Sequence, residues 1–197
     1  MPRLLHVVTH PEVEVRADVP VPDWSLSELG RRRAQGLLRL WWVPRVRHVF
    51  SSSERKAAQT AELLARACGA TGVAVDPDLG ENDRSATGFL PPAEFEELAD
   101  LFFAHPARSS RGWETAQDAQ VRVVGAVGRC LRHAVEGDVA VVCHGAVATL
   151  LWCHLAREPI DRRHDQPGQG SWYSVDLDTL SPLGRWRRLP LPVDPDG

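Results

Sequence analysis

The sequence predicts an α/β protein, a three-layer sandwich in which a mostly parallel central sheet carries helices on both faces. Short apolar runs rich in β-branched residues alternate along the chain with longer segments whose apolar residues recur at helical spacing. Two of these runs end at a histidine, His10 and His144, and ligands bind at the carboxyl ends of strands in such sheets. With 197 residues, 43% of them hydrophobic, the chain can bury a full core without a disulfide or a structural metal.

The first half of the chain contains three predicted strands and two predicted helices. Ser25 or Ser27 supplies the N-cap of the first helix, and Gly69 closes the second as a C-terminal cap. Within the first helix, the run Arg31–Arg33 is interpreted as a solvated face. The predicted strands are Leu4–Val8, Val46–Phe50 and Val73–Val75, and the predicted helices run from about Glu28 to Trp42 and from Glu54 to Cys68.

The second half adds three helices and two strands after a polar segment, Leu79–Pro92, that is typical of a functional loop. The main domain is expected to comprise residues 1–180. Residues 181–197 form a Pro-rich C-terminal tail that either packs on the surface through Trp186 or frays. The predicted helices are Ala93–Ala104, Glu114–Val135 and Gly145–Ala156, and the predicted strands are Val139–Cys143 and Trp172–Leu177.

Composition excludes several classes of function. A net charge of −3 without a basic cluster argues against a nucleic-acid partner. No stretch approaches the roughly 20 apolar residues of a membrane span, and the N-terminal apolar run is too short for a signal peptide. The four cysteines lack the spacing of a zinc site, so we expect buried free thiols in a cytoplasmic protein. The oligomeric state is left open, with a homodimer as one option.

Five segments carry the chemical information, and they begin at Thr9, Trp24, Ser51, Trp113 and Val141. They are Thr-His-Pro-Glu, Trp-Ser-Leu-Ser-Glu-Leu-Gly-Arg, Ser-Ser-Ser-Glu-Arg-Lys-Ala-Ala-Gln-Thr-Ala, Trp-Glu and Val-Val-Cys-His-Gly-Ala-Val. In order and spacing these segments resemble the motifs of the histidine phosphatase (phosphoglycerate mutase-like) superfamily. The resemblance covers about residues 3 to 177, and the five matches in register are specific together.

The resemblance implies a phosphoglycerate mutase-like fold and a phosphatase that acts on small phosphate monoesters. In this family a neutral imidazole attacks the phosphoryl group, and water then hydrolyses the phosphohistidine. By this resemblance His10 is the nucleophile and His144 the second histidine of the pocket. No metal or other cofactor is implied, because fixed side chains supply the positive charge.

The general acid is expected in the loop after the third strand, where Leu-Gly-Glu resembles the family's Leu-x-Glu segment. Glu81 is the matching residue, and Asp83 is the alternative. A working acid needs a pKa raised towards neutrality by burial or by neighbouring charges.

Two departures affect the expected phosphate site. The arginine before the nucleophile is replaced by Thr9, and the arginine of the Ser-Ser-Ser segment by Lys56. Each lost charged hydrogen bond costs about 1.5–3 kcal/mol, so together they lower rate or affinity by about 10²- to 10⁴-fold unless another cation replaces them. Arg84 is the first choice for that replacement, with Arg55 and Arg31 as alternatives.

The departures motivate a second hypothesis, a catalytically weak phospholigand-binding or regulatory protein that is built on the same fold. Substrate specificity is expected to lie in the variable segment Thr87–Arg111, which is partly apolar. The polar segment His164–Gly170 either reaches the mouth of the pocket or is a plain loop.

Overall fold

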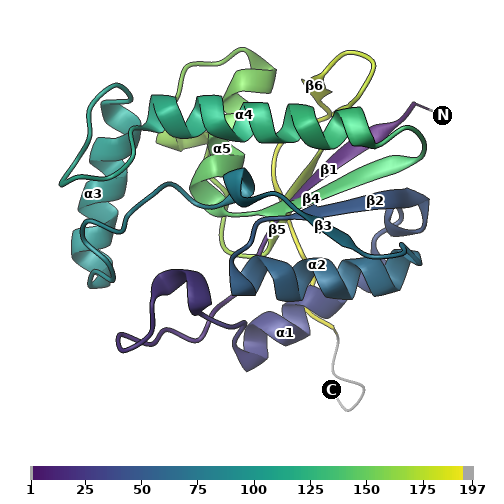
Figure 1. Cartoon of the computed structure of the whole chain (residues 1–197), viewed down its shortest axis with the longest axis horizontal. Coiled ribbons are helices and arrows are strands. Elements are labelled where there is room, and N and C mark those ends of the chain that lie inside the picture. The colour runs from purple at the N-terminus through teal and green to yellow at the C-terminus, as the bar shows by residue number, and fades with distance from the viewer. Residues whose placement is uncertain (1, 193–197) are drawn as a thin grey trace.

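A computed structural model describes residues 2–192 and shows one seven-stranded sheet surrounded by α-helices (Figure 1). The strands are β1 (Leu4–Thr9), β2 (Val46–Ser51), β3 (Val73–Val75), β4 (Asp138–Cys143), β5 (Ser171–Asp176), β6 (Ser181–Pro182) and β7 (Arg187–Arg188). The α-helices are α1 (Glu28–Ala34), α2 (Arg55–Cys68), α3 (Pro92–Ala104), α4 (Ala116–His133) and α5 (Gly145–Ala156). None of the helices between residues 2 and 192 combines the length and the apolar character that a bilayer crossing requires.

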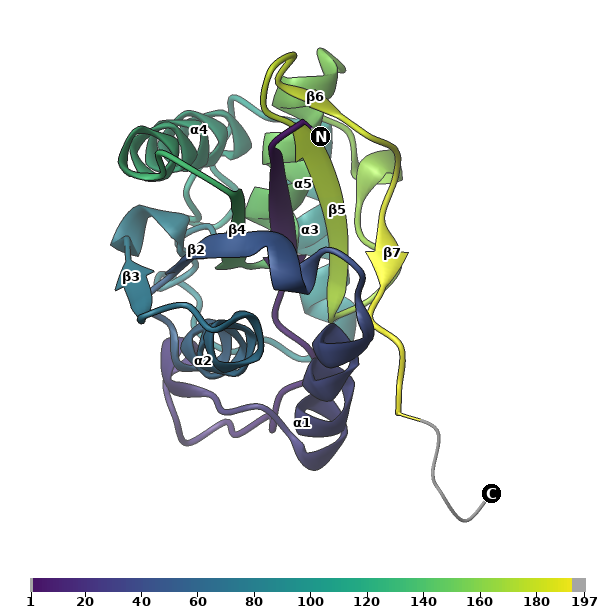
Figure 2. The same ribbon diagram turned by 90° about the vertical axis from the view of Figure 1, so that its right-hand side faces the viewer.

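The strand order is β3-β2-β4-β1-β5-β6, and β7 pairs with the remaining part of β5. The pairs β1–β4, β2–β4 and β2–β3 are parallel, whereas β5 runs antiparallel to its partners. Seen along the sheet, α4 and α5 cover one face and α2 and α1 the other (Figure 2). The predicted α/β class with a mostly parallel sheet between two helical layers is therefore confirmed.

Strand β1 lies in the middle of the sheet and is buried on both faces. Leu5 and Val7 belong to the apolar cluster that includes α4 and α5, and Val8 belongs to the cluster that includes α2. All six residues of β4 are also buried. Strands covered on both faces have near-continuous apolar sequences, which explains why the sequence predicts these two central strands.

The predicted long first helix is wrong beyond Ala34. The chain continues as a short 3-10 helix over Gln35–Arg39 and then turns Trp42 into the core, where its ring stacks on that of His6 at 4.1 Å. Gly36 permits this path, because a Cβ there would lie 2.2 Å from the carbonyl oxygen of Pro190. The helix therefore ends where the C-terminal segment packs against it.

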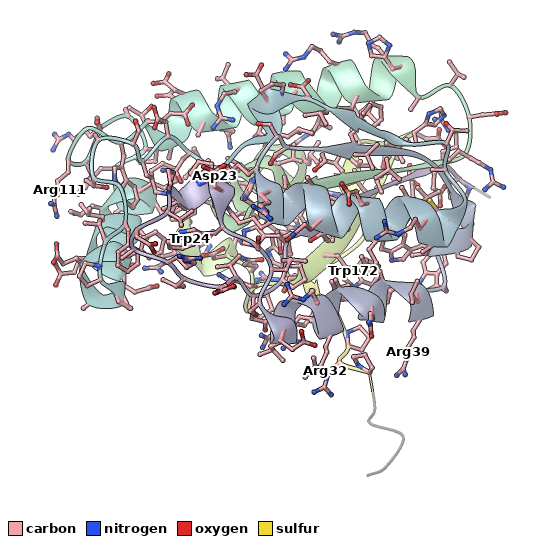
Figure 3. The ribbon with its side chains drawn as sticks, turned by 60° about the horizontal axis from the view of Figure 1, so that its bottom comes forward. Asp23, Trp24, Arg32, Arg39, Arg111 and Trp172 are labelled. Carbon is pink, nitrogen blue, oxygen red and sulfur yellow. The ribbon has the colours of Figure 1, made fainter. Side chains whose placement is uncertain are left out.

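The Arg31–Arg33 run is a solvated face only in part. Figure 3 shows the Arg32 side chain directed away from the sheet. Arg33 is buried, and its Nε donates to both carboxylate oxygens of Glu12, at 2.7 and 2.9 Å. Arg188 donates to the same carboxylate at 3.0 Å, so these two arginines fix the loop that follows His10.

The segment that begins at Ser181 contributes β6 and β7 to the same sheet. The indole ring of Trp186 contacts the Tyr173 ring at 4.8 Å and donates its N–H to the His164 carbonyl. Leu189 is also buried. Residues 181–189 thus pack on the domain, and residues 193–197 of the predicted tail lie outside the described part of the chain.

Helix α1 packs through Gly30 against the loop that follows His10. The carbonyl oxygen of Glu12 accepts hydrogen bonds from the N–H and hydroxyl of Ser27, the N-cap of α1. A Cβ on Gly30 would lie 2.0 Å from this carbonyl oxygen. We expect Gly30→Ala to destabilise the protein by about 1–3 kcal/mol through this clash, although alanine is the better helix former.

The matched control is Gly125→Ala in α4, where the nearest atom to an added Cβ is the Arg129 Nη1 at 3.8 Å. That substitution should leave stability unchanged or raise it by up to about 1 kcal/mol. Denaturant unfolding of both variants measures the difference. A Gly30→Ala protein as stable as Gly125→Ala would show that α1 can move away from the loop at no cost.

Candidate functional site

His10 stands directly after β1, at the carboxyl end of the parallel strands. Its N–H donates to the carbonyl of Cys143 in the β4 strand at 3.2 Å, and its carbonyl accepts from Gly170 at 2.9 Å. The ring Nδ1 lies 2.8 Å from the Pro11 carbonyl oxygen. Because a carbonyl can only accept, Nδ1 carries the hydrogen and Nε2 keeps its lone pair. Burial, and secondly the charge of Lys56, lower the pKa of His10 from 6.5 to about 4, so the ring is neutral at pH 7.

His144 follows β4, the strand beside β1, and its ring centroid lies 5.1 Å from that of His10. Its Nε2 is 2.7 Å from the hydroxyl oxygen of Ser52 and 3.3 Å from Oε1 of Glu54. The carboxylate only accepts, so this contact favours a hydrogen on Nε2. Nδ1 is buried without a hydrogen-bond partner. Burial lowers the pKa of His144 well below its ordinary value.

The buried histidines make stability depend on pH. The pKa of His6 is lowered by burial to about 4, as is that of His10, whereas an unfolded histidine binds a proton near pH 6.5. Between these values the unfolded chain holds more protons than the folded one, so stability falls as pH falls. We expect the melting temperature to drop between about pH 6.5 and about pH 4, with roughly 3 kcal/mol lost per histidine by the end.

Melting curves of the wild type and His10→Ala across this range test the expectation. The variant has one such imidazole fewer, so its melting temperature should fall less steeply with decreasing pH. Parallel curves would contradict a buried, neutral His10.

Glu81 lies in the loop between β3 and α3, with its carboxylate at the N-terminus of α5. Its oxygens accept from the N–H groups of Ala146 and Val147 at 3.3 and 3.2 Å. Arg84 Nη2 lies 3.9 Å from Oε2. Burial raises the pKa of Glu81 against the opposing charge of Arg84, and the nearby Glu54 raises it further. A carboxyl group with a raised pKa can hold a proton for donation at higher pH than an exposed one.

The competing acid, Asp83, lies in an exposed position, and the backbone N–H of Ser85 lowers its pKa. The Glu81 loop is held from α4 by Arg122, which donates to the carbonyl oxygens of Gly80 at 3.0 Å and of Glu81 at 3.1 Å. Arg122 also pairs with Glu114 at 2.7 Å. The sequence offered no signal for Arg122, because its role depends on how α4 packs over the loop.

The expected cations take three different positions. Lys56 is buried in the first turn of α2, where Nζ donates to the Val21 carbonyl at 3.0 Å and pairs with Glu54. Arg84 lies beside Glu81. Arg55, in contrast, is exposed and does not reach the two histidines by any contact observed in residues 2–192.

Thr9 occupies the position of the family's arginine but is fully buried. Its hydroxyl lies 2.6 Å from Oε1 of Gln166, to which it donates, and accepts from the N–H of Ser171 at 3.0 Å. Gln166 in turn packs on Gly145, where a Cβ would lie 2.4 Å from Nε2 of the amide. The segment His164–Gly170 therefore reaches the site through Gln166.

The variable segment Thr87–Arg111 borders Arg84. The guanidinium of Arg84 lies over the rings of Phe95 and Trp113, at 5.0 and 5.5 Å from their centroids. Phe89 contacts Trp24 at 5.7 Å. In Figure 3 the Trp24 segment lies beside α2 and Arg111 points outward at the far edge. The segment thus places the aromatic side chains of Phe89 and Phe95 close to Arg84 and Trp24.

The site groups His10, His144, Lys56, Glu81 and Arg84 at one edge of the sheet. Sequence reasoning missed Ser52 and Glu54, although both lie within the third motif. The available signal was position: Glu54 is next to Arg55, which was assigned to the site, and Ser52 lies just after the predicted second strand. No group of three or more His, Cys, Asp and Glu residues within 2–192 is arranged to hold a metal ion.

Comparisons with known proteins show what the fold and the sequence resemble. The chain is 35% identical over 79 residues to phosphoglycerate mutase-like protein 4 of Arabidopsis thaliana, a match that covers 38% of this chain and 34% of the plant protein. The structure resembles that of mycobacterial glucosyl-3-phosphoglycerate phosphatase, with a TM-score of 0.75 and 24% identity over 94% of this chain and 96% of the other. It also resembles YhfR of Bacillus stearothermophilus, with a TM-score of 0.73 and 21% identity over 98% of each chain.

At these identities the solved structures establish the fold. The sequence model of the histidine phosphatase superfamily (branch 1) matches residues 5–184, which is most of the chain and includes every segment of the site. The chain therefore belongs to the histidine phosphatase superfamily.

Proposed function

We propose that the protein hydrolyses phosphate monoesters through a phosphohistidine on His10, without a metal cofactor. The observation that carries the proposal is the Nδ1–H of His10 bound to the Pro11 carbonyl at 2.8 Å, which leaves the Nε2 lone pair for attack. Membership of the superfamily and the neutral state of the buried ring support it.

In the first step the Nε2 lone pair attacks phosphorus and the bond from phosphorus to the ester oxygen breaks. The carboxyl of Glu81 gives its proton to that oxygen, so the leaving group departs as an alcohol. As positive charge grows on the His10 ring, the Pro11 carbonyl stabilises its Nδ1–H. His144, Lys56 and Arg84 hold the phosphoryl oxygens.

In the second step water attacks the phosphorus of the phosphohistidine. The Glu81 carboxylate takes a proton from this water, the phosphorus–nitrogen bond breaks, and the pair of electrons returns to Nε2. Inorganic phosphate leaves, and both His10 and Glu81 are restored. The substrate is expected to be a small phosphorylated molecule whose alcohol part contacts the Thr87–Arg111 wall.

A specific observation favours the second hypothesis, a weak phosphatase that serves as a phospholigand-binding protein. The Thr9 hydroxyl is engaged by Gln166, and Lys56 is paired with Glu54, so neither replaces a free arginine. Against it stand a buried, neutral imidazole at His10 and a nearby carboxyl with a raised pKa at Glu81, which a binding protein does not need. We therefore favour the enzyme.

Phosphate release from a panel of small phosphomonoesters, measured with EDTA present, tests the proposal. Turnover that survives EDTA supports a metal-independent phosphatase and directs attention to the alcohol part of the best substrate. If no ester releases phosphate while inorganic phosphate still raises the melting temperature, the site is a binding site and the enzyme proposal fails.

A further inference from the structure

Glu54 is a carboxylate that the proposed reaction does not use, yet it touches three groups of the site. It occupies the N-cap position of α2 without a capping hydrogen bond from its side chain, which is 13% exposed. Oε1 accepts from the N–H of Glu81 at 2.9 Å and lies 3.3 Å from Nε2 of His144. Oε2 pairs with the Nζ of Lys56. One side chain thus connects the acid loop, the second histidine and the buried lysine.

The contacts of Glu54 fix its charge. Burial opposes ionisation, but His144 and Lys56 lower the pKa of the Glu54 carboxyl to about 2. Since the His144 ring is neutral, the partner of the Glu54 anion is Lys56, whose Nζ pairs with Oε2. Glu54 and Lys56 therefore form an internal ion pair.

This ion pair changes the electrostatics of the site. His10 and His144 are neutral, and burial disfavours the charged form of Glu81. Since Glu54 cancels Lys56, Arg84 is the one remaining net positive charge among these groups. A phosphoryl group that approaches His144 and Lys56 also meets the Glu54 carboxylate at short range in a poorly hydrated site, where like charges repel strongly.

We propose that Glu54 acts as an internal anion that competes with the phosphoryl group for Lys56 and His144, so that the site prefers monoanionic to dianionic phosphoryl groups. A dianion is repelled by the carboxylate. A monoanion carries one negative charge fewer and one P–O–H hydrogen more than the corresponding dianion, so it is repelled less and can donate that hydrogen to Oε1 or Oε2. This inference rests on the proposed function of the site and names Glu54 as its specificity-determining residue.

The affinity for inorganic phosphate, measured by calorimetry on either side of its second ionisation, tests the proposal without requiring turnover. The wild type should bind phosphate at least about 10-fold more tightly at about pH 5 than at about pH 8.5. The isosteric variant Glu54→Gln should bind the dianion at least about 10-fold more tightly than the wild type does, because one negative charge has left the site.

Two further variants test whether a change in phosphate affinity has a cause other than Glu54. Glu158→Gln removes an exposed carboxylate that pairs with Arg163 outside the site, and it should bind phosphate as the wild type does. Glu81 also titrates, so the Glu54→Gln comparison is repeated in a Glu81→Gln background. A gain in dianion affinity that persists there belongs to Glu54; a gain that vanishes there overturns the proposal.

Equal wild-type affinity at the two pH values, or unchanged affinity in a folded Glu54→Gln protein, also overturns it. Equal wild-type affinity overturns the proposal even if the variant does not fold. If the wild type hydrolyses monoesters through His10 while showing no preference for the monoanion, this inference alone fails. If neither phosphate form binds and no ester is hydrolysed, the proposed function fails with it.

Discussion

His10→Ala is expected to lower kcat/KM for phosphate release by at least about 10³-fold. Alanine removes the Nε2 lone pair that attacks phosphorus in the proposed first step, and no phosphohistidine can then form at residue 10. The fold should persist, because the hydrogen bonds of residue 10 to Cys143 and Gly170 are made by its main chain. Phosphate release under EDTA and a melting curve measure the two effects.

The matched control is His154→Ala, which removes an exposed imidazole from α5. That variant should keep wild-type kcat/KM. Rapid denaturation during turnover should also trap a phosphoryl group on the peptide that contains His10, and His10→Ala should show none. Residual activity of His10→Ala equal to that of the wild type would remove His10 as the nucleophile.

The sequence alone predicts that His10 and His144 each stand at the end of a buried strand. Strands β1 and β4 are buried on both faces, so their sequences are nearly continuous apolar runs with a clear end. Parallel strands place their carboxyl ends at one edge of the sheet, so His10 and His144 had to meet there if β1 and β4 were neighbours. The pairing itself, Thr9 beside Cys143, needed the structure.

Other features depend on contacts between residues far apart in the chain. The hydrogen bond from Thr9 to Gln166 joins residues separated by 157 positions, and local sequence patterns carry no information on such pairs. The end of α1 at Ala34 likewise depends on the approach of Pro190 to Gly36.

Glu54 shows a different limit of sequence reasoning. A glutamate beside an exposed helix start is ordinarily solvated, and the motif drew attention to Lys56 as the replacement for an arginine. Only the turn from β2 into α2 directs both side chains to the same place, so that the acid neutralises the lysine. The motif thus predicted where Lys56 lies, but not that Glu54 cancels its charge.

Glu81→Gln is expected to lower kcat/KM by about 10²- to 10⁴-fold for alkyl phosphates, whose leaving oxygen needs a proton. The N–H groups of Ala146 and Val147 bind different oxygens of Glu81, and the single amide oxygen of glutamine can still accept from one of them. Arg122 also holds the loop through the carbonyl oxygens of Gly80 and Glu81, so the loop should keep its position. With 4-nitrophenyl phosphate, whose leaving group needs little protonation, the loss should be much smaller. The ratio of the two losses therefore reports proton donation rather than damage to the site.

The pH dependence of activity provides a second test of Glu81 as the general acid. Glu81 donates only when protonated, so the activity of the wild type should fall as pH rises through the raised pKa of Glu81. On the acid side it should fall near the His10 pKa of about 4, because a protonated imidazole has no lone pair to attack with. Glu81→Gln should keep the acid limb and lose the contribution of Glu81 to the alkaline limb.

Asp83→Asn is the control, since Asp83 is exposed in the same loop and its pKa is lowered. It should retain wild-type kcat/KM and both limbs of the profile. Any alkaline limb that remains in Glu81→Gln belongs to ionisation of the phosphoryl group itself, which is the effect expected from Glu54. If Asp83→Asn instead lost the alkaline limb and Glu81→Gln kept it, the acid would have to be reassigned to Asp83, and the loop would have to close over the site during turnover.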